Sequence, residues 1–414
     1  MGKPGNFHDM FDKYAEIAVK IGVNVQKNQQ LIIEAPIDAA AFVRKLVEKA
    51  YEAGAKQVYV DYSDEALTRL HYLRQPEAGL KEFPQWKVNG YVEMAENNAA
   101  LLQVYAPNPN LLRGVDPDRV ALANKAKAAA IEKFKRYIID DKISWSMVSV
   151  PTEGWASHVF PDLPEADRTA KLWELIFYVT RVNRENPVEA WNKHTRRLMD
   201  QAAYLTEKQF KKLHYTSRKT NLTIELPKNH VWMSAKAEND AGTSFVPNIP
   251  TEEVFTVPLR TGVHGTVGST KPLNYNGALI EDFSLTFRDG KVVDFSATSG
   301  SDTLKKLLDT DDGARFLGEV ALVPHNSPIS NTNVLFYNTL YDENASCHLA
   351  LGFAFPSGIK DGLTMSSEER KEHGLNDSLV HEDFMVGSAD LNIDGELANG
   401  TKEPIFRNGN WAFS

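Results

Sequence analysis

The sequence predicts an α/β N-terminal domain with a mainly parallel sheet, followed by a β-rich α+β C-terminal domain. In the first half, short apolar runs typical of strands alternate with amphipathic runs of helical period, which is the pattern of parallel strands joined by crossover helices. In the second half, apolar residues alternate one by one between turn dipeptides, which is typical of antiparallel hairpins. A length of 414 residues fits two domains better than one.

The first half opens with Phe11, Tyr14, Ala18 and Ile21, whose spacings of three and four predict a helix. The segments of regular pattern that follow are a strand at 31–33, a helix at 38–54 with Asp38 as its N-cap, strands at 58–60 and 101–105, a helix from Pro117 to about 134 capped by Asp116, a strand at 143–150 and a mostly helical stretch at 164–212.

The second half begins with the alternating apolar residues Leu222, Ile224 and Leu226, which predict a half-buried strand. Alternation at 283–287 and 293–295 around Asp289-Gly290 predicts an antiparallel hairpin. Further tight turns are expected at the dipeptides Asp394-Gly395 and Asn399-Gly400. The change of pattern places the domain boundary at residue 215, so we expect an α/β domain at 1–215 and a β-rich domain at 216–414.

Composition and charge narrow the class of protein. Hydrophobic residues make up 42% of the chain and charged residues 24%, which is typical of a globular protein. A net charge of -9 without a dense basic patch argues against a nucleic-acid partner. Because Cys347 is the single cysteine, no disulfide can form within the chain. No apolar run has the length of a signal peptide at the N-terminus or of a membrane span elsewhere, so we expect a cytoplasmic protein without a membrane partner.

Glu319 lies within a strongly apolar run at 316–323 that reads as a strand. Burying a carboxylate without a partner costs several kcal/mol, so this side chain requires a compensating cation. A metal ion and the neighbouring Arg315 are both suitable partners, and the run alone does not decide between them.

Other polar side chains flank apolar runs of the second half in the same way. In a strand at 381–386, His381 and Asp383 project to one face because they are two residues apart. Glu252 and Glu253 precede the run at 254–257, and strand parity sends one of them inward without saying which. His348 lies among small apolar residues, where a histidine is either an ordinary core residue or a ligand.

Taken together, these side chains form a mixed imidazole and carboxylate set that suits zinc, cobalt or manganese. The members of the set are Glu253, Glu319, His348, His381 and Asp383. The chain contains no HExxH motif, so the ligands of such a site have to come from separate strands of the second domain.

The second half contains several distinctive longer runs. They lie at 248–256 (NIPTEEVFT), 269–273 (STKPL), 317–319 (LGE), 342–350 (DENASCHLA), 381–385 (HEDFM) and 406–411 (FRNGNW). These runs resemble those of the aminopeptidase T family, which includes aminopeptidase S and PepS, and the similarity extends from the first helix to the terminal tryptophan.

The resemblance implies a metallo-aminopeptidase that releases N-terminal residues from peptides by a two-metal hydrolytic mechanism. It implies two divalent ions (zinc, cobalt, manganese or magnesium), a homodimer, and peptide substrates with a free N-terminus. By motif position, the metal-site residues would be Glu253, Glu319, His348, His381 and Asp383 in the C-terminal domain. Glu253 or Glu319 would also transfer the proton to the leaving amine, and the sequence does not separate the two.

One position departs from the pattern of the family. The seventh residue after His348 is usually tyrosine in the family, and here it is Phe355. A tyrosine hydroxyl would suit a hydrogen-bond donor to the tetrahedral oxyanion. Alternatively, Phe355 serves packing alone and a metal ion stabilises the oxyanion.

Two other functions fit parts of the sequence. The first is a cysteine-type hydrolase using Cys347, although neighbours in a strand point to opposite faces, so Cys347 and His348 cannot hydrogen-bond to each other there. The second is a non-catalytic peptide-binding or metal-binding protein. Gly262, Gly265 and Gly268 lack the spacing of a dinucleotide-binding loop and read as an ordinary loop.

The polar segment at 357–378 reads as a surface loop or a lid.

Overall fold

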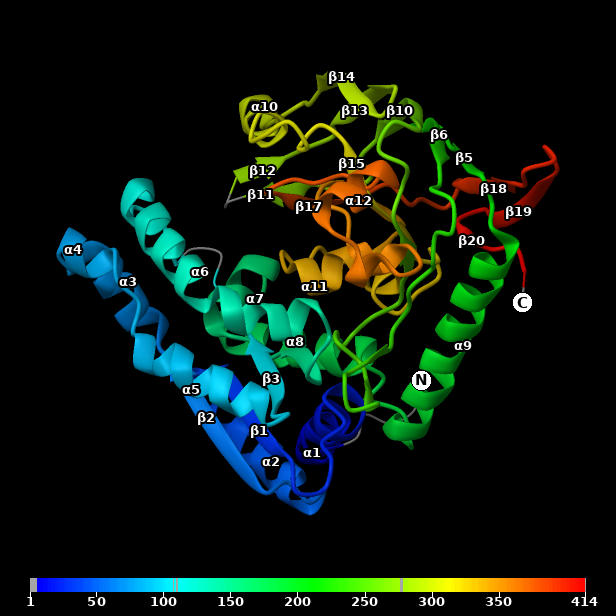
Figure 1. Ribbon diagram of the computed structural model, residues 1–414. Helices are drawn as coiled ribbons and strands as arrows, with labels where there is room; N and C mark the ends of the chain where they lie inside the picture. The colour runs from blue at the N-terminus through cyan, green and yellow to red at the C-terminus, as the bar shows by residue number, and fades with distance from the viewer. Residues whose placement is uncertain (1–5, 107, 109–110, 276–277, 414) are drawn as a thin grey trace. The chain divides into compact units, whose positions relative to one another are not determined.

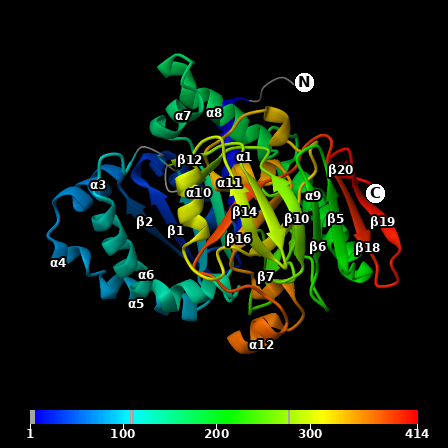
Figure 2. The ribbon, with the colours of Figure 1, turned by 90° about the horizontal axis from the view of Figure 1, so that it is seen from above.

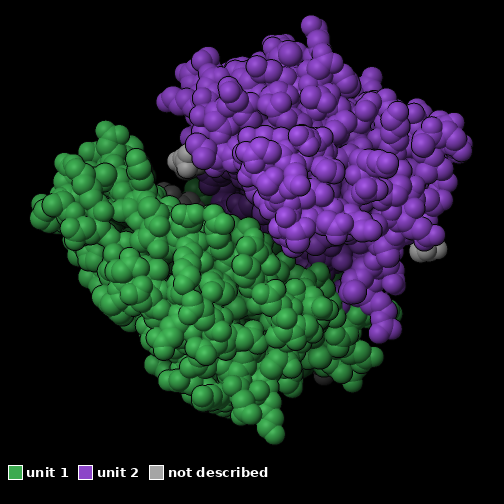
Figure 3. Space-filling view, viewed as in Figure 1, with its two compact units in different colours: residues 1–194, 236–250 green, residues 195–235, 251–414 purple. Residues whose placement is uncertain are grey.

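A computed structural model of the protein describes residues 6–106, 108, 111–275 and 278–413. The chain forms two compact units: unit 1 comprises residues 1–194 and 236–250, and unit 2 comprises residues 195–235 and 251–414 (Figure 3). The units separate within the helix α9 (Pro187–Lys208), whereas the sequence patterns place a domain boundary at residue 215, which stays a prediction. Within the described ranges, no helix combines the length and the apolarity that crossing a bilayer requires.

Unit 1 is built on a four-stranded sheet in the order β2-β1-β3-β4, in which every pair of neighbours is parallel (Figure 1). The strands are β1 (Gln30–Pro36), β2 (Gln57–Ser63), β3 (Ala100–Tyr105) and β4 (Trp145–Ser149), and a separate pair is formed by β7 (Ala237–Glu238) and β8 (Ser244–Phe245). The predicted parallel sheet of the first half is thereby confirmed. Ile32 and Leu101 are fully buried at its centre, as expected for strands covered on both faces.

The helices of unit 1 precede, connect and follow these strands (Figure 2). They are α1 (Phe7–Ile17), α2 (Ala40–Glu52), α3 (Glu65–Arg74), α4 (Glu77–Leu80), α5 (Gln85–Glu96), α6 (Pro117–Ile139), α7 (Glu153–Val159) and α8 (Glu165–Val179). Asp116 caps α6 by accepting from the N–H of Asp118, as predicted. The predicted N-cap of α2 was wrong, because Asp38 lies inside a short 3-10 turn (Ile37–Ala39) that precedes the helix.

Unit 2 contains an eight-stranded antiparallel sheet in the order β14-β13-β10-β6-β5-β18-β19-β20. The strands are β5 (Lys212–Thr216), β6 (Asn221–Glu225), β10 (Val263–Gly268), β13 (Ser284–Arg288), β14 (Lys291–Ser296), β18 (Asn392–Glu396), β19 (Lys402–Arg407) and β20 (Asn410–Trp411). The predicted hairpin around Asp289-Gly290 is confirmed as β13 and β14.

Two glycine predictions in this sheet were wrong for the same physical reason. Gly395 lies within β18 rather than in a turn, and a Cβ there would come 2.6 Å from the ring of Phe210. Gly265 lies within β10 rather than in a loop, with a φ of +113° and only 2.2 Å between a would-be Cβ and the backbone oxygen of Asn221. In both places glycine permits a close approach inside the sheet.

A second, four-stranded antiparallel sheet of unit 2 has the order β17-β16-β15-β9. Its strands are β9 (Val254–Thr256), β15 (Leu317–Leu322), β16 (His348–Gly352) and β17 (His381–Met385). Val320, Leu349 and Phe384 are cross-strand neighbours on one face, and all three are buried in the core of the unit. The opposite face is therefore the one that carries the polar residues of these strands.

Short elements complete unit 2. They are β11 (Leu273–Tyr275), β12 (Ala278–Ile280), α10 (Ser301–Leu308), α11 (Thr339–Asp342), α12 (Ser367–Glu372) and several 3-10 turns, of which Glu343–Ala345 directly follows α11. The polar segment at 357–378 packs through Ile359, Met365 and Leu375 against Val257 and Ala354. This segment has a small apolar core of its own.

Candidate metal centre

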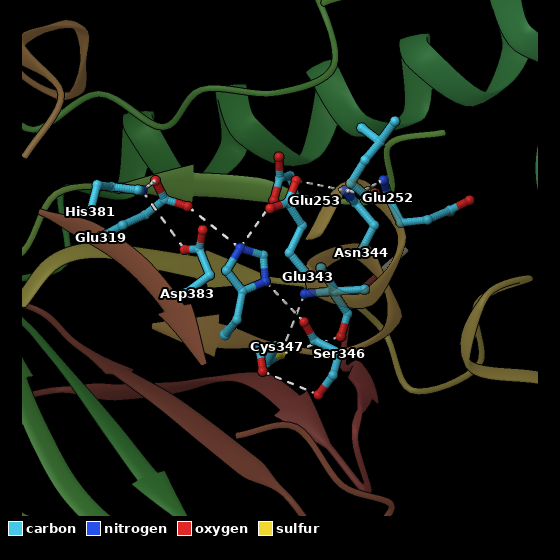
Figure 4. Close-up of polar contacts among 12 residues, drawn as sticks. Glu252, Glu253, Glu319, Glu343, Asn344, Ser346, Cys347, His381 and Asp383 are labelled. Carbon is cyan, nitrogen blue, oxygen red and sulfur yellow. Dashed lines mark hydrogen bonds and ion pairs between the residues drawn. The ribbon is translucent and has the colours of Figure 1, made fainter. Parts of the chain in front are cut away.

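The register of the four-stranded sheet places the predicted site residues on one face. Asp383 pairs with Ala350, Ala350 pairs with Glu319, and paired residues in antiparallel strands project to the same side. His348 and His381 are each two residues from these positions or their partners, so they share that side. Figure 4 shows Glu319, His381 and Asp383 together, with Glu253 beside them.

Glu253 joins this face from the residue just before β9. Phe255 pairs with Ala321 and Ala321 with His348, so strand parity extended by two residues puts Glu253 on the side of His348. The sequence did not decide which of Glu252 and Glu253 points inward. The strand register shows that Glu253 is the one on this face of the sheet. The Glu252 N–H donates to Asn344 Oδ1 at 2.7 Å, and its side chain points away from Glu319, His381 and Asp383 (Figure 4).

The five side chains form two overlapping groups that share Glu319. His348 Nε2 lies 3.2 Å from Glu253 Oε2 and 3.5 Å from Glu319 Oε1. His381 Nε2 lies 3.5 Å from Glu319 Oε2 and 3.8 Å from Asp383 Oδ1. Within each group the ligand atoms all lie within 4.8 Å of one another. The two carboxylate oxygens of Glu319 therefore face different imidazoles.

Both imidazoles are held by backbone carbonyls. His348 Nδ1 is 3.1 Å from the carbonyl oxygen of Ser346, and His381 Nδ1 is 2.7 Å from that of Phe353. A carbonyl oxygen only accepts, so in each ring Nδ1 carries the proton. In the neutral ring the lone pair then lies on Nε2, which faces the carboxylates. This is the usual arrangement of a metal-binding histidine and its supporting acceptor.

The carboxylates of this face require positive charge. Burial raises the pKa of Glu319, the hydrogen bond to His348 lowers it, and the nearby Asp383 raises it further, with a net increase. For His348, burial lowers the pKa, but hydrogen bonds to Glu253 and Glu319 raise it more. Arg315, the alternative partner of Glu319, pairs instead with Asp309 at 2.6 Å. No arginine or lysine of the described ranges forms an ion pair with these carboxylates.

A divalent cation fits the residues that are present. Asp383 Oδ1 is buried and has no hydrogen-bond donor in the described part of the chain. Left in that state, a buried carboxylate oxygen loses its hydration without replacement. Imidazole nitrogens and carboxylate oxygens are the donors that zinc, cobalt and manganese accept, and no thiolate is needed.

The site also includes Glu343, which is not among the five residues predicted from the sequence. It begins the 3-10 turn Glu343–Ala345, and its Oε1 accepts from Asn344 Nδ2 at 3.3 Å. Burial, followed by the charges of Glu253 and Asp383, raises the pKa of Glu343 well above its usual value. In the sequence, Glu343 was marked only by its place in the polar run before His348. Because it lies outside a strand, the alternation of side chains could not show which way it points.

Phe355 lies directly beside the site. Its ring centroid is 4.8 Å from that of His381, with the rings inclined at 61° in an edge-to-face contact. The position that the family resemblance marks as unusual therefore touches a residue of the candidate centre, and a substitution there would alter the surroundings of His381.

Cys347 lacks the environment of a nucleophile. The residue is buried, its Sγ donates to the carbonyl oxygen of Val323 at 3.2 Å, and burial raises its pKa to about 12. The thiolate, which is the reactive form, is thus disfavoured near neutral pH. His348 Nε2 is directed at Glu253 and Glu319, as described above, so it does not activate this thiol.

Comparisons with known proteins agree with one another. The family described as thermophilic metalloprotease (M29) matches residues 7–411. Aminopeptidase 2 of Geobacillus stearothermophilus is 54% identical over 402 residues, which cover 97% of each chain. Aminopeptidase AmpS of Bacillus subtilis (strain 168) is 49% identical over 99% of this chain and 100% of its own. The solved structure of wild-type AmpT from Thermus thermophilus superimposes with a TM-score of 0.93 at 39% identity, covering 99% of this chain and 100% of that one.

Proposed function

Because this chain belongs to the thermophilic metalloprotease (M29) family, we propose that its aminopeptidase reaction uses two divalent metal ions bound on the polar face of the four-stranded sheet in unit 2. The chain is a metal-dependent aminopeptidase, that is, a hydrolase and an exopeptidase. The observation that supports two ions is the bridging position of Glu319, whose two oxygens face two separate groups of ligand atoms.

The proposed ligands divide between the two groups. Glu253 and His348 would bind one ion, His381 and Asp383 would bind the other, and Glu319 would serve both. The native ions are zinc, cobalt, manganese or magnesium in this proposal. Bound ions of this kind supply Lewis acidity toward the scissile carbonyl and lower the pKa of water.

The protein residues then orient and transfer protons. The carbonyls of Ser346 and Phe353 keep Nδ1 of the two histidines protonated, so each Nε2 remains available to a cation. A carboxylate that is not fully occupied as a ligand can accept a proton from water and deliver it to the leaving amine. Glu253 and Glu319 are the residues predicted for this role. We add Glu343, because it faces the same cluster and belongs to neither ligand group.

The proposed metal centre also suits a substrate with a free α-amino group. Two bound divalent ions would offset the charges of Glu253, Glu319, Glu343 and Asp383, so the carboxylates alone would not attract a cation. A neutral α-amino group has a lone pair with which it could bind one of the ions, whereas the nitrogen of an acylated amine does not offer one. We therefore propose peptides with a free N-terminus as the substrates.

Further proposals concern the surroundings of the enzyme. The lack of any possible internal disulfide supports a cytoplasmic location, and the acidic net charge supports the absence of a nucleic-acid partner. The family resemblance supports a homodimer. We also propose that the chain divides into domains at 1–215 and 216–414. In addition, we propose that the protein has no membrane partner.

Metal removal tests the proposed mechanism. A strong chelator should abolish peptidase activity, and a divalent ion should restore it, because the proposed ligands are neutral imidazoles and carboxylates. His381→Ala should also lower the metal content of the purified protein. His373→Ala, an exposed histidine at the end of α12, is the matched control and should keep its metal. Full activity in a demonstrably metal-free sample would reject the mechanism.

Three glutamine variants identify the residue that transfers the proton. We expect Glu343→Gln to lower kcat by about a hundred- to ten-thousand-fold while metal content stays unchanged, as is usual when a general acid or base is removed. Glu253→Gln and Glu319→Gln should lose metal together with activity. Metal analysis and steady-state kinetics on the same preparations distinguish the roles. An unchanged kcat in Glu343→Gln would return the role to Glu253 or Glu319.

The amine requirement is tested with matched peptides. A tetrapeptide with a free N-terminus should be shortened one residue at a time, whereas its N-acetylated counterpart should resist cleavage. Mass spectrometry of the products at several times measures both. Efficient cleavage of the acetylated peptide at internal bonds would show an endopeptidase and contradict this proposal.

Phe355→Tyr tests the importance of the missing hydroxyl. Because the ring of Phe355 contacts His381, a tyrosine hydroxyl would lie near the reacting groups and could donate to the oxyanion. We expect kcat to rise, toward the roughly hundred- to thousand-fold that one such donor contributes in other enzymes, with little change in KM or metal content. If kcat does not rise in a folded, metal-replete variant, Phe355 serves packing alone.

A further inference from the structure

The strand β17, which carries His381 and Asp383, lies at the edge of the four-stranded sheet. The hydrogen bonds just beyond its two ends show which of its backbone groups face β16. The Phe353 N–H donates to the Val380 oxygen, and the Val386 N–H donates to the Cys347 oxygen. Backbone groups alternate in direction along a strand, so the even-numbered residues between 380 and 386 face β16.

It follows that the N–H and C=O groups of His381 and Asp383 point away from β16, toward the open edge. Met385, the next odd-numbered residue, also faces away from β16, because its backbone oxygen accepts a hydrogen bond from the Thr270 N–H at 2.8 Å. No strand of the described residues pairs with β17 at His381 and Asp383. Unpaired edge groups of this kind are a template for another extended chain.

A hollow lies along this open edge. It has a volume of about 50 Å³, and Leu273, Asn274, Tyr337, Glu382 and Asp383 are among the residues that line it. After Thr270, which bonds to Met385, the chain contributes Pro272, Leu273 and Asn274 to the lining of the hollow. Asp383 belongs both to the hollow and to the candidate metal centre, so a peptide that runs along this edge of β17 would reach the site.

We propose that the part of the peptide substrate beyond the scissile bond binds as an added strand along β17, with its main chain paired to the backbone of His381 and Asp383. This inference rests on the proposed function, since it needs the scissile bond to lie at the candidate metal centre. The occupant is an extended peptide because main-chain pairing recognises the N–H and C=O groups that every peptide has. Side chains would alternate between the two faces of the sheet.

Pairing of this kind has a specific signature. In an antiparallel addition, one residue of the peptide directs both its N–H and its C=O toward β17, and the next directs both away. If the backbone N–H groups of the peptide are methylated one at a time, binding should therefore weaken at every second residue only. Recognition through side chains alone would not produce this alternation.

The test uses the intact, metal-replete enzyme and a tetrapeptide whose first peptide bond is a reduced, uncleavable amide. Single N-methyl groups are placed on the third and on the fourth residue in turn, and calorimetry measures binding. We expect one of these positions to weaken binding at least about tenfold and its neighbour to have little effect, since a main-chain hydrogen bond is lost at only one of them. Equal effects at both positions, or none, would overturn the proposal.

A pair of protein variants provides an independent measurement. Asn274→Trp, at an exposed residue that lines the hollow, should weaken binding of the unmethylated tetrapeptide analogue about tenfold or more by filling the edge. Val293→Trp, at an exposed position of β14, is the control of equal bulk and should bind normally. Thermal unfolding checks that both variants are folded. Normal binding by a folded Asn274→Trp would contradict the proposal.

The failure of this inference and the failure of the proposed function are distinguishable. Cleavage of the ordinary tetrapeptide from its N-terminus tests the function, whereas the N-methyl series tests only the edge of β17. A peptide that is cleaved but shows no alternation would leave the function intact and reject the added strand.

Discussion

The candidate centre depends on one electrostatic constraint: carboxylates of a single sheet face lie close together without an arginine or lysine partner among the described residues. Glu319 is 6% exposed and Asp383 Oδ1 is buried without a hydrogen-bond donor, so water stabilises neither, and the basic groups beside them are the two histidines. Clustered carboxylates of this kind are costly unless a cation or a proton compensates them. A pair of divalent ions as the compensating charge would explain three features together: the arrangement of the surrounding strands, the orientation of the two imidazoles and the position of Glu343.

The fold supplies this arrangement through ordinary antiparallel register. Three strands place their residues on one face, and the chain just before β9 adds Glu253. The reverse face is apolar, with Val320 and Leu349 in the core, so the strands cannot shift by one residue without burying the charged set in that core. The hydrophobic packing of unit 2 therefore fixes the positions of the polar groups as well. The same alternation leaves the backbone groups of His381 and Asp383 at an open edge, which links the proposed chemistry to the proposed binding of the peptide chain.

Much of this was predictable from the sequence wherever a periodic pattern was present. The parallel sheet of the first half, the hairpin at Asp289-Gly290 and the common face of His381 and Asp383 all follow from alternation and turn chemistry. The helix α3 was not predicted, because none of its residues is buried and its apolar residues form no core-facing stripe. Gly395 was read as part of a turn, because a sequence does not reveal the ring of Phe210 against which it packs. Local sequence also could not choose between Arg315 and a metal as the partner of Glu319, since the choice depends on where Asp309 lies in the fold.

The central claim is that the polar face of the four-stranded sheet binds two divalent cations that share Glu319. The most direct measurement is anomalous diffraction from crystals of the purified protein, recorded above and below the absorption edge of the metal found by elemental analysis. We predict two anomalous peaks, one within bonding distance of Glu253, Glu319 and His348, and the other within bonding distance of Glu319, His381 and Asp383. Peaks that lie elsewhere in the protein, with none on this face of the sheet, would contradict it.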